Sequence, residues 1–276
     1  MNVTKKTQLN LVIGYPLEHT QSPELHQAVY QQFGIDAVLL AQPQISLELL
    51  IQAIKILSVK LTAVTLPYKE KVIPYLDECS EEVKALHAAN TIIQRQEKLY
   101  GYNTDIDGIA FALRDVVVQG KQILVIGAGG AARAIGYFLK KNCANILWIN
   151  RTQNKAMTLA NKFGGEVICH NKLNTTHIDI IINTTPIGMY PHADASPLFN
   201  YAFNRYQTVF DMVYHPMMTQ LLKQAQKNEA KIISGLDMFI GQGLKQIELY
   251  TGKQHTPVMI NQLRQLLIKN QRRVRT

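Results

Sequence analysis

A glycine-rich string in the middle of the chain has the clearest chemical meaning. Gly127-Ala128-Gly129-Gly130-Ala131-Ala132 directly follows an apolar run at 123–126. The order fits the G-x-G-x-x-G/A pattern, in which the glycines allow a tight turn and a close approach of the backbone to a pyrophosphate. A lone glycine string is more often a flexible turn. The strand pattern before it and the helix pattern after it favour a dinucleotide site.

The charges around this string indicate which dinucleotide it binds. An NAD site usually has an acidic residue about 20 positions after the glycines, which binds the ribose 2′-hydroxyl. Here the next strand ends at Asn150-Arg151-Thr152, and residues 116–165 contain no acidic residue. That stretch contains seven basic residues: Lys121, Arg133, Lys140, Lys141, Arg151, Lys155 and Lys162. Because a guanidinium can hold a phosphate through two donors, Arg151 with Lys155 predicts NADP.

Four polar strings in the front part of the chain carry groups that suit a polyhydroxylated ligand. They are Thr20-Gln21-Ser22, Thr65-x-Pro67-x-Lys69, Asn90-Thr91 and Asn103-Thr104-Asp105. Each lies where an expected strand or helix ends, and binding residues concentrate at such ends. Taken singly, Lys69 would be a surface lysine and Asp105 a helix N-cap, as is usual for these residue types.

The apolar pattern predicts the elements that position these residues. Short apolar runs alternate with amphipathic stretches, which is typical of βαβ units. Ser22 is expected to cap a helix that Gly34 ends. We expect strands at 9–13, 37–41, 62–66, 123–126, 146–150, 167–169, 178–183 and 208–211, and a hairpin of 91–95 with 99–102. We expect helices at 22–33, 46–57, 69–76, 80–86, from 105, and at 130–141, 152–163, 237–250 and 257–270.

Composition limits the class of protein. A chain of 276 residues suggests two domains at roughly 100–200 residues each. The net charge of +9 suits a nucleic acid or an anionic ligand, and the cations near the glycine string favour the ligand. The isolated cysteines, the polar N-terminus and the lack of a long apolar run predict a cytoplasmic protein without a membrane partner. The scattered histidines lack metal-ligand spacing, so we expect no metal.

Taken together, these strings resemble the shikimate/quinate dehydrogenase family over nearly the whole chain. The matching strings are, in order, Gly14-Tyr-Pro16…His19-Thr20-Gln-Ser22-Pro23, Val64-Thr65-Leu-Pro67-Tyr-Lys69, Ala89-Asn90-Thr91, Gly101-Tyr-Asn103-Thr104-Asp105, Gly127-Ala-Gly-Gly-Ala131, Asn150-Arg151-Thr152, Asn183-Thr-Thr-Pro-Ile-Gly188-Met189, Asp211-Met-Val-Tyr214 and Gly235…Met238…Gln242. Each string is weak evidence by itself, and the ordered set is highly specific. The resemblance implies reversible, NADP-dependent conversion of shikimate to 3-dehydroshikimate, a step of aromatic amino acid biosynthesis.

The resemblance also implies a role for each site residue. Thr20 and Ser22, helped by Tyr214, would bind the substrate carboxylate. The ring hydroxyls would be held by Thr65, Lys69, Asn90, Asp105 and Gln242, of which Lys69 and Asp105 would form the catalytic pair. The cofactor would be bound by Gly127, Ala128, Gly129, Gly130, Ala131, Asn150, Arg151, Thr152 and Lys155, and Met212 and Gly235 would line the nicotinamide through backbone atoms.

Three positions depart from the family pattern. Thr20 stands where Ser is more usual, which keeps the hydroxyl. Lys155 stands where Arg is common, which weakens the grip on the 2′-phosphate. Ala63 stands where Asn usually precedes the Val-Thr pair, so an amide facing the substrate would be missing. Of the three, Ala63 is the one that would alter substrate preference.

The expected architecture is two α/β domains. Residues 1–104 would bind substrate, residues 105–236 would form a Rossmann-type NADP domain, and residues 237–276 would be helices that return to the substrate domain. The substrate would sit in the cleft between the domains. Alternatives are a quinate/shikimate dehydrogenase of broader specificity, a non-catalytic NADP-binding regulator, and, more remotely, a nucleic-acid-binding module. The oligomeric state stays open, with a homodimer as one assembly to test.

Overall fold

The computed structural model describes residues 3–18 and 20–273, so His19 of the first motif lies outside the described residues. The chain divides into two compact units. Unit 1 combines residues 1–108 with residues 240–276, and unit 2 spans residues 109–239. The boundaries fall inside two helices, α4 (Asp105–Ala112) and α8 (Gly235–Thr251). Each unit is an α/β structure with its own sheet.

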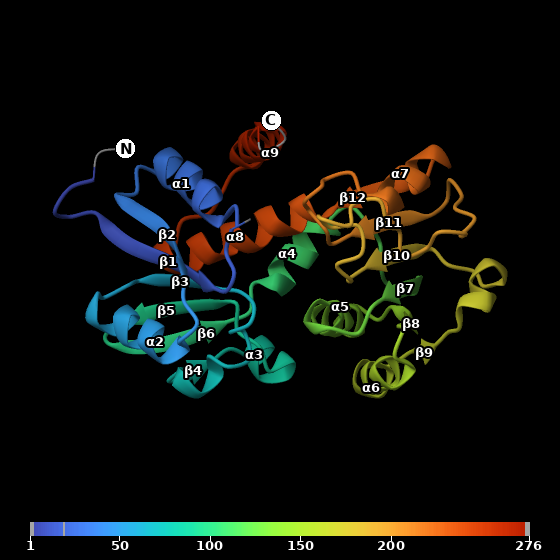
Figure 1. Cartoon of the computed structure of the whole chain (residues 1–276), viewed down its shortest axis with the longest axis horizontal. Coiled ribbons are helices and arrows are strands. Elements are labelled where there is room, and N and C mark those ends of the chain that lie inside the picture. The colour runs from blue at the N-terminus through green and yellow to red at the C-terminus, as the bar shows by residue number, and fades with distance from the viewer. Residues whose placement is uncertain (1–2, 19, 274–276) are drawn as a thin grey trace. The chain divides into compact units, whose positions relative to one another are not determined.

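The sheet of unit 1 is mixed, with the strand order β2-β1-β3-β5-β6-β4 (Figure 1). Strands β2, β1 and β3 are parallel, as the alternation of strands and helices predicts. Strands β5 and β6 form the expected antiparallel hairpin, which pairs with β3 through β5. The strand bounds are β1 (Gln8–Gly14), β2 (Ala37–Pro43), β3 (Leu61–Val64), β4 (Glu78–Cys79), β5 (Thr91–Arg95) and β6 (Lys98–Tyr102).

The helices of unit 1 mostly begin and end at the signals that the sequence provides. Helix α2 is capped by Ser46, whose Oγ accepts from the Leu49 N–H at 3.4 Å, and Gly34 ends α1 at a φ of +63°. Ser22 is not the cap of α1: it is the first helical residue, and Gln21 takes the cap position, although its side chain does not cap the N–H groups of the helix. The other bounds are α1 (Ser22–Phe33), α2 (Leu47–Ile56), α3 (Glu81–Leu86) and α9 (Pro257–Arg273).

The expected helix at 69–76 is wrong. The structure has only a short 3-10 turn, η1 (Ile73–Tyr75), within a segment of turns. Proline explains the difference, because Pro74 lacks the N–H that an α-helix would use at that position.

The sheet of unit 2 is entirely parallel, with the order β12-β11-β10-β7-β8-β9. Strands β7, β8 and β9 lie on one side of the point where the order reverses, and β10, β11 and β12 lie on the other. This is the arrangement of a doubly wound dinucleotide-binding fold. The bounds are β7 (Gln122–Ile126), β8 (Asn145–Ile149), β9 (Glu166–Val167), β10 (Ile180–Asn183), β11 (Thr208–Asp211) and β12 (Lys231–Ser234). The predicted Rossmann-type fold is therefore confirmed.

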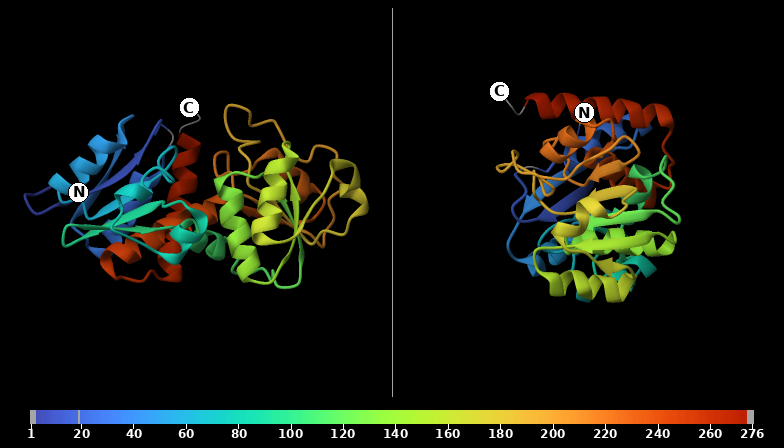
Figure 2. Two further views of the ribbon diagram at one scale, coloured as in Figure 1. Left: turned by 90° about the horizontal axis from the view of Figure 1, so that it is seen from below. Right: turned by 90° about the vertical axis from the view of Figure 1, so that its right-hand side faces the viewer.

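Helices cover both faces of this sheet. Figure 2 shows α5 (Gly130–Lys141) and α6 (Gln153–Phe163) on the same side, and Figure 1 shows α7 (Gln220–Lys227) on the other. The close packing of α5 depends on Gly136, where a Cβ would lie 2.8 Å from the buried Trp148 ring and 2.7 Å from Phe163. Within the described residues, no helix is long and apolar enough to cross a membrane.

Candidate functional site

The loops after β1 and β3 meet at one edge of the unit 1 sheet. The Thr65 N–H donates to the Ile13 carbonyl at 2.9 Å, and the Tyr15 N–H donates to the Leu66 carbonyl at 3.0 Å. Only glycine fits at position 14, because a Cβ there would lie 2.4 Å from Thr65 Cγ2. The strand order reverses at β1, which lies between β2 and β3, and open α/β sheets bind ligands at such a switch point.

Each of these two loops carries residues of a predicted substrate motif. Thr20 and Ser22 follow β1, and the Ser22 N–H donates to Thr20 Oγ1 at 3.4 Å. Thr65 and Lys69 follow β3, and both are half-buried, as Thr20 and Ser22 are. Ala63 precedes them within β3 and is buried, with 5% of its surface exposed.

Lys69 and Asp105 form an ion pair. Lys69 Nζ donates to Asp105 Oδ2 at 2.6 Å, although 36 residues separate them in the chain. The side chains remain 27% and 18% exposed, so a ligand can reach both. Lys69 is not a fully solvated lysine, because its side chain is only partly exposed. Asp105 is the first helical residue of α4 rather than its N-cap. Charge-assisted pairs of this length are short and directional, which suits an acid–base role.

Asn90 holds the second oxygen of this carboxylate. Its Nδ2 donates to Asp105 Oδ1 at 2.9 Å, and its Oδ1 accepts from the Thr104 N–H at 2.8 Å. The Asn90 segment is tied to the lysine loop, because the Ala89 N–H donates to the Lys69 carbonyl at 2.7 Å. Four polar strings that are distant in the sequence thus contribute to one connected edge of unit 1.

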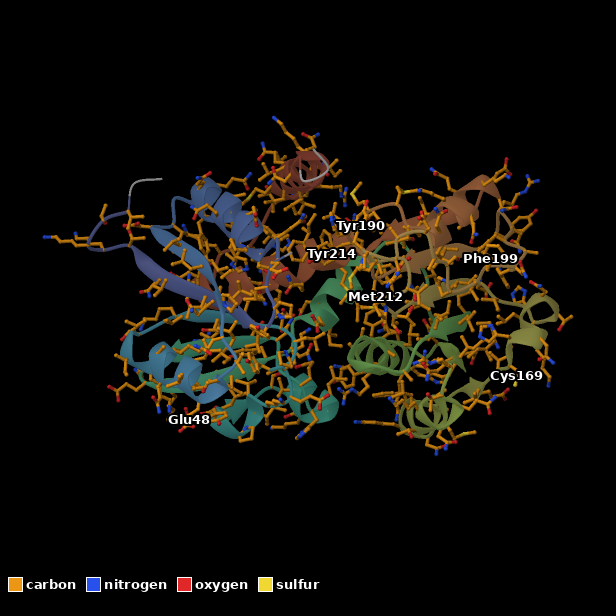
Figure 3. The ribbon with its side chains drawn as sticks, in the orientation of Figure 1. Glu48, Cys169, Tyr190, Phe199, Met212 and Tyr214 are labelled. Atoms are coloured by element: carbon orange, nitrogen blue, oxygen red, sulfur yellow. The ribbon has the colours of Figure 1, made fainter. Side chains whose placement is uncertain are left out.

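The remaining predicted substrate residues lie on later elements. Gln242 lies on α8, in the part of that helix that belongs to unit 1. Tyr214 lies in unit 2, in the segment after β11, where Figure 3 also labels Met212. The Tyr214 ring stacks on Phe239 with the centroids 4.9 Å apart and 10° between the ring planes.

The glycine loop of unit 2 has the geometry that a pyrophosphate site requires. Gly127 follows β7 at a φ of +111°, and a Cβ there would lie 2.5 Å from Thr184 Oγ1. Gly129 is the N-cap of α5, and a Cβ built on it meets nothing within 4 Å, so its backbone lies open. The loop sits where the strand order reverses between β7 and β10. The first turn of α5 has no acidic residue, so its N–H groups can bind phosphate oxygens.

The basic residues predicted to bind the 2′-phosphate follow the next strand. Asn150, Arg151 and Thr152 link β8 to α6, and Asn150 Nδ2 donates to the Thr152 carbonyl at 2.9 Å. Arg151 and Lys155 are exposed. A guanidinium at the end of the second strand of a doubly wound sheet suits a ribose 2′-phosphate, and no carboxylate lies in this segment to repel it. The chain therefore fits NADP.

A buried carboxylate, Asp211, holds the segment that carries Met212. Its Oδ1 accepts from Asn183 Nδ2 at 2.9 Å and from the Val213 N–H at 3.0 Å, and its Oδ2 accepts from Thr219 Oγ1 at 2.7 Å. Position 235 requires glycine, because a Cβ there would lie 2.3 Å from the Met212 carbonyl oxygen. Burial raises the pKa of Asp211 to about 6, and its hydrogen bonds only partly oppose this shift.

This raised pKa predicts how the stability of unit 2 depends on pH. Between about pH 4 and 6, folded Asp211 keeps a proton that the unfolded chain has released. The free energy of unfolding should therefore fall as the pH rises through this window, by about 2–4 kcal/mol at 1.36 kcal/mol per pKa unit. Asp211→Asn should remove this fall. Urea titrations that follow fluorescence of the single tryptophan, Trp148 in unit 2, measure it.

The control is to compare the unfolding free energies of wild type and Asp211→Asn at each pH. Burial lowers the pKa of His26 in unit 1 to about 4, which destabilises the folded state as the pH falls below about 6.5. That effect is present in both proteins and cancels in their difference. If the unfolding free energies of wild type and Asp211→Asn run parallel from pH 4 to 7.5, the ionisation of Asp211 is not linked to folding.

Two other kinds of site are less well supported. In the described part of the chain, no group of three or more His, Cys, Asp or Glu side chains is arranged to hold a metal ion. A shallow hollow in unit 2 is lined by residues at the amino ends of the strands, among them Lys121, Thr208 and Lys231. It lies at the sheet edge opposite the glycine loop, whereas open α/β sheets bind their ligands at the carboxyl ends of the strands.

Family models match both units. Residues 12–92 match the shikimate dehydrogenase substrate binding domain, and residues 111–188 match the shikimate / quinate 5-dehydrogenase model. The NADP(+) shikimate dehydrogenase of Carboxydothermus hydrogenoformans is 37% identical over 265 residues, which cover 91% of this chain and 94% of that protein. The chain belongs to the shikimate dehydrogenase family.

Solved structures of shikimate dehydrogenases share the fold of the chain. A crystal structure of a shikimate dehydrogenase in complex with NADP+ has a TM-score of 0.90 and 34% identity, and covers 97% of each chain. The Thermus thermophilus enzyme, in complex with NADP(H) and shikimate, has a TM-score of 0.84 and 30% identity, and covers 94% of this chain and 99% of that one.

Proposed function

We propose that the protein is an NADP-dependent shikimate dehydrogenase, which interconverts shikimate and 3-dehydroshikimate in aromatic amino acid biosynthesis. The observation that carries this proposal is the Lys69–Asp105 pair. Its 2.6 Å hydrogen bond lies at a partly exposed edge of unit 1, among hydroxyl and amide side chains. Family membership and the NADP-dependent relatives support the same reaction.

Unit 1 would supply all of the proposed substrate contacts except that of Tyr214, which belongs to unit 2. The hydroxyls of Thr20 and Ser22, with Tyr214, suit the carboxylate of shikimate. The ring hydroxyls match the donors and acceptors of Thr65, Lys69, Asn90, Asp105 and Gln242. Support for this assignment comes from the loops after β1 and β3, which meet at the switch point, and from the contacts of Asn90 with Asp105.

The Lys69–Asp105 pair would handle the proton. When shikimate is oxidised, its hydroxyl loses a proton to the pair as the hydride leaves the carbon. In the reverse direction, the Lys69 ammonium stabilises the developing alkoxide and donates a proton to it. Asp105 keeps the ammonium aligned through the 2.6 Å contact, and Asn90 holds Asp105 in place. The pair acts as one acid–base unit.

Unit 2 would bind NADP, which supplies the hydride acceptor when it is bound. The backbone of Gly127, Ala128, Gly129, Gly130 and Ala131 suits the pyrophosphate, and Asn150, Arg151, Thr152 and Lys155 suit the 2′-phosphoribose. Met212 and Gly235 would face the nicotinamide through backbone atoms. For a hydride to pass, the nicotinamide must reach the alcohol carbon that unit 1 binds.

Arg151 is expected to decide between the two nicotinamide cofactors. Arg151→Ala should weaken NADP+ binding by about 1.5–3 kcal/mol, because it removes a charge-assisted hydrogen bond to the 2′-phosphate. NAD+ lacks that phosphate, so its affinity should hardly change. Calorimetric dissociation constants for both cofactors measure the preference.

A matched control separates this contact from general charge. Lys172→Ala removes an exposed cation from the same unit, in the 3-10 turn η2 (His170–Thr175). It should leave the ratio of NADP+ to NAD+ affinity unchanged. If Arg151→Ala also leaves that ratio unchanged, the assignment of Arg151 is wrong.

A dehydrogenase assay tests the proposed function itself. The purified chain should reduce NADP+ in the presence of shikimate, and its kcat/KM should be lower with NAD+ or with quinate. Ala63 makes the quinate comparison informative, because the missing amide removes one means of rejecting that substrate. NADP+ binding without turnover of either acid would instead support a non-catalytic regulator.

We make two further proposals, one about the localisation of the protein and one about its oligomeric state. We expect a cytoplasmic protein, which cell fractionation would test. We also consider a homodimer, which light scattering at several concentrations would distinguish from a monomer. Nucleic-acid binding is not expected, and a gel-shift assay at low salt would reveal it.

A further inference from the structure

A chain of buried polar side chains crosses the interior of unit 1 and ends at Asp105. Its members are Asn10, Tyr30, His26, Gln246, Thr91 and Asn90, and each is at most 2% exposed. They come from β1, α1, α8 and the start of β5. Asn10, Tyr30, His26 and Gln246 belong to none of the predicted site motifs. Buried polar groups are costly unless they are paired, so such a series needs an explanation.

Backbone groups fix the orientation of the amide side chains. The Leu61 N–H donates to Asn10 Oδ1 at 3.0 Å, so Asn10 Nδ2 faces Tyr30 Oη at 2.9 Å. The Thr104 N–H donates to Asn90 Oδ1, so Asn90 Nδ2 faces the Asp105 carboxylate. Backbone donors and acceptors cannot exchange roles, so these orientations follow from chemistry.

The third amide is fixed in the same way. Gln246 Nε2 donates to the Asn90 carbonyl at 3.3 Å and to Thr91 Oγ1 at 3.0 Å. Gln246 Oε1 therefore faces His26 Nε2, at 3.1 Å, and must accept from it. The Thr91 hydroxyl in turn donates to Asn90 Oδ1 at 2.8 Å.

These constraints determine the tautomer of His26. Nε2 carries the proton, so Nδ1 is the acceptor for the Tyr30 hydroxyl at 3.2 Å. The donors then run in one direction, from Asn10 through Tyr30 to His26, and from Gln246 through Thr91 to Asn90 and Asp105. Burial independently favours a neutral ring, because it lowers the pKa of His26 to about 4.

We propose that His26 and Gln246 are positioning residues that act with the Thr104 N–H: by donating to Thr91 Oγ1, Gln246 turns the Thr91 hydroxyl toward Asn90 Oδ1 and so helps to hold the Asn90 nitrogen toward Asp105. This inference rests on the proposed function, which gives Asp105 its role in catalysis. If Asn90 turned over, its oxygen would face the carboxylate oxygen that now lies 2.9 Å from Nδ2, and the two would repel. The Asp105 carboxylate would then lose its alignment with Lys69.

Gln246 also holds the helix face that carries a proposed substrate residue. Gln242 and Gln246 are four positions apart on α8, so both project from the same face. Hydrogen bonds from Gln246 to the Asn90 carbonyl and Thr91 anchor this face to the start of β5. One side chain thus positions both the Asn90 amide and the helix turn of Gln242.

Nuclear magnetic resonance of the wild-type chain tests the direction of these hydrogen bonds without any activity. Long-range proton–nitrogen spectra of the labelled protein report which ring nitrogen of each histidine carries a proton, and the signal missing in His26→Asn identifies His26. At pH 7 we expect a proton on Nε2 and none on Nδ1. A proton on Nδ1, alone or together with Nε2, would overturn the proposal.

A variant then tests the effect on turnover. Gln246→Met keeps the volume and removes both hydrogen-bonding ends, so kcat with shikimate should fall about 10–100-fold, as expected for a misaligned catalytic group. The loss should therefore persist when shikimate is saturating, and the dissociation constant for NADPH should stay unchanged. The matched control is Gln207→Met in unit 2, because Gln207 is equally buried and donates to the Ile178 carbonyl and to the Tyr201 hydroxyl.

Both variants lose buried hydrogen bonds, so their melting temperatures should fall alike, whereas kcat should fall in Gln246→Met alone. Equal kcat in the two variants would overturn the proposal. If Gln246→Met does not fold, the protonation of the His26 ring in the wild type decides the question. A wild-type protein without shikimate activity would refute the proposed function, whereas His26 protonated on Nδ1 in an active enzyme would refute only the positioning role.

Discussion

Lys69→Ala should lower kcat for shikimate oxidation by about 10²–10⁴, the range for loss of a positioned acid–base group. The 2.6 Å contact between Lys69 Nζ and Asp105 Oδ2 would be lost, and with it the ammonium that stabilises the alkoxide. The dissociation constant for NADP+ should stay nearly constant, because its proposed ligands belong to unit 2. Steady-state kinetics at saturating shikimate and NADP+, with cofactor titration, measure both effects.

Lys71→Ala is the matched control for this change. Lys71 is an exposed lysine two positions further along the same loop, and it should keep wild-type kcat. Turnover by Lys69→Ala equal to that of Lys71→Ala would exclude Lys69 from the chemistry. A loss of activity that follows weaker NADP+ binding would contradict the proposed division of roles between the units.

Asp105→Asn should produce the second-largest loss, a fall in kcat of about 10²–10³. The carboxylate accepts from Lys69 at one oxygen and from Asn90 at the other. An amide offers only one acceptor atom, so its NH₂ group must face one of these two donors. The pair also loses the negative charge that lets it take up the hydroxyl proton. The same assay measures this variant.

Asp107→Asn provides the control for the loss of an aspartate from the first turn of α4. Asp107 lies two positions after Asp105, and burial raises the pKa of its carboxyl group, so a neutral amide is a mild change there. It should retain kcat within a few-fold. If Asp105→Asn turns over as fast as Asp107→Asn, the charge of Asp105 is not needed for proton transfer.

Local sequence signals predicted most of the fold of unit 2. The glycine string, the apolar runs and the amphipathic stretches between them mark β7, α5, β8 and α6 within one or two residues. The last helix and strand, α7 (Gln220–Lys227) and β12 (Lys231–Ser234), were missed. A signal for α7 was nevertheless present, because its buried Leu221, Leu222 and Ala225 lie at helical spacing and Thr219 caps its first turn.

Unit 1 shows a different limit. The hairpin of β5 and β6 was predicted, but nothing in the local sequence indicates that β5 pairs antiparallel with β3, whose other neighbour, β1, runs parallel to it. Strand pairing depends on tertiary packing rather than on local propensity. The helix expected at 69–76 failed because a proline there outweighs a favourable apolar spacing.

The candidate site was predictable in its polar strings but not in its supporting contacts. Lys69, Asn90 and Asp105 were selected from their residue types and from the family resemblance, and they lie in contact. The interior chain behind them was not foreseen, because His26 and Gln246 are 220 residues apart in sequence. One local signal was present: Asn10 interrupts the apolar run of β1, and a polar residue in a buried strand needs a partner.

A crystal structure of the wild-type protein with shikimate and NADP+ would show whether Lys69 and Asp105 act on a hydroxyl of the substrate. We expect one ring hydroxyl of shikimate to lie within about 2.6–3.2 Å of Lys69 Nζ, with the nicotinamide against the carbon that bears this hydroxyl. The contacts of Asp105 with Lys69 and Asn90 should persist. If shikimate binds with every hydroxyl out of hydrogen-bonding reach of Lys69 and Asp105, this pair does not carry out the proton transfer.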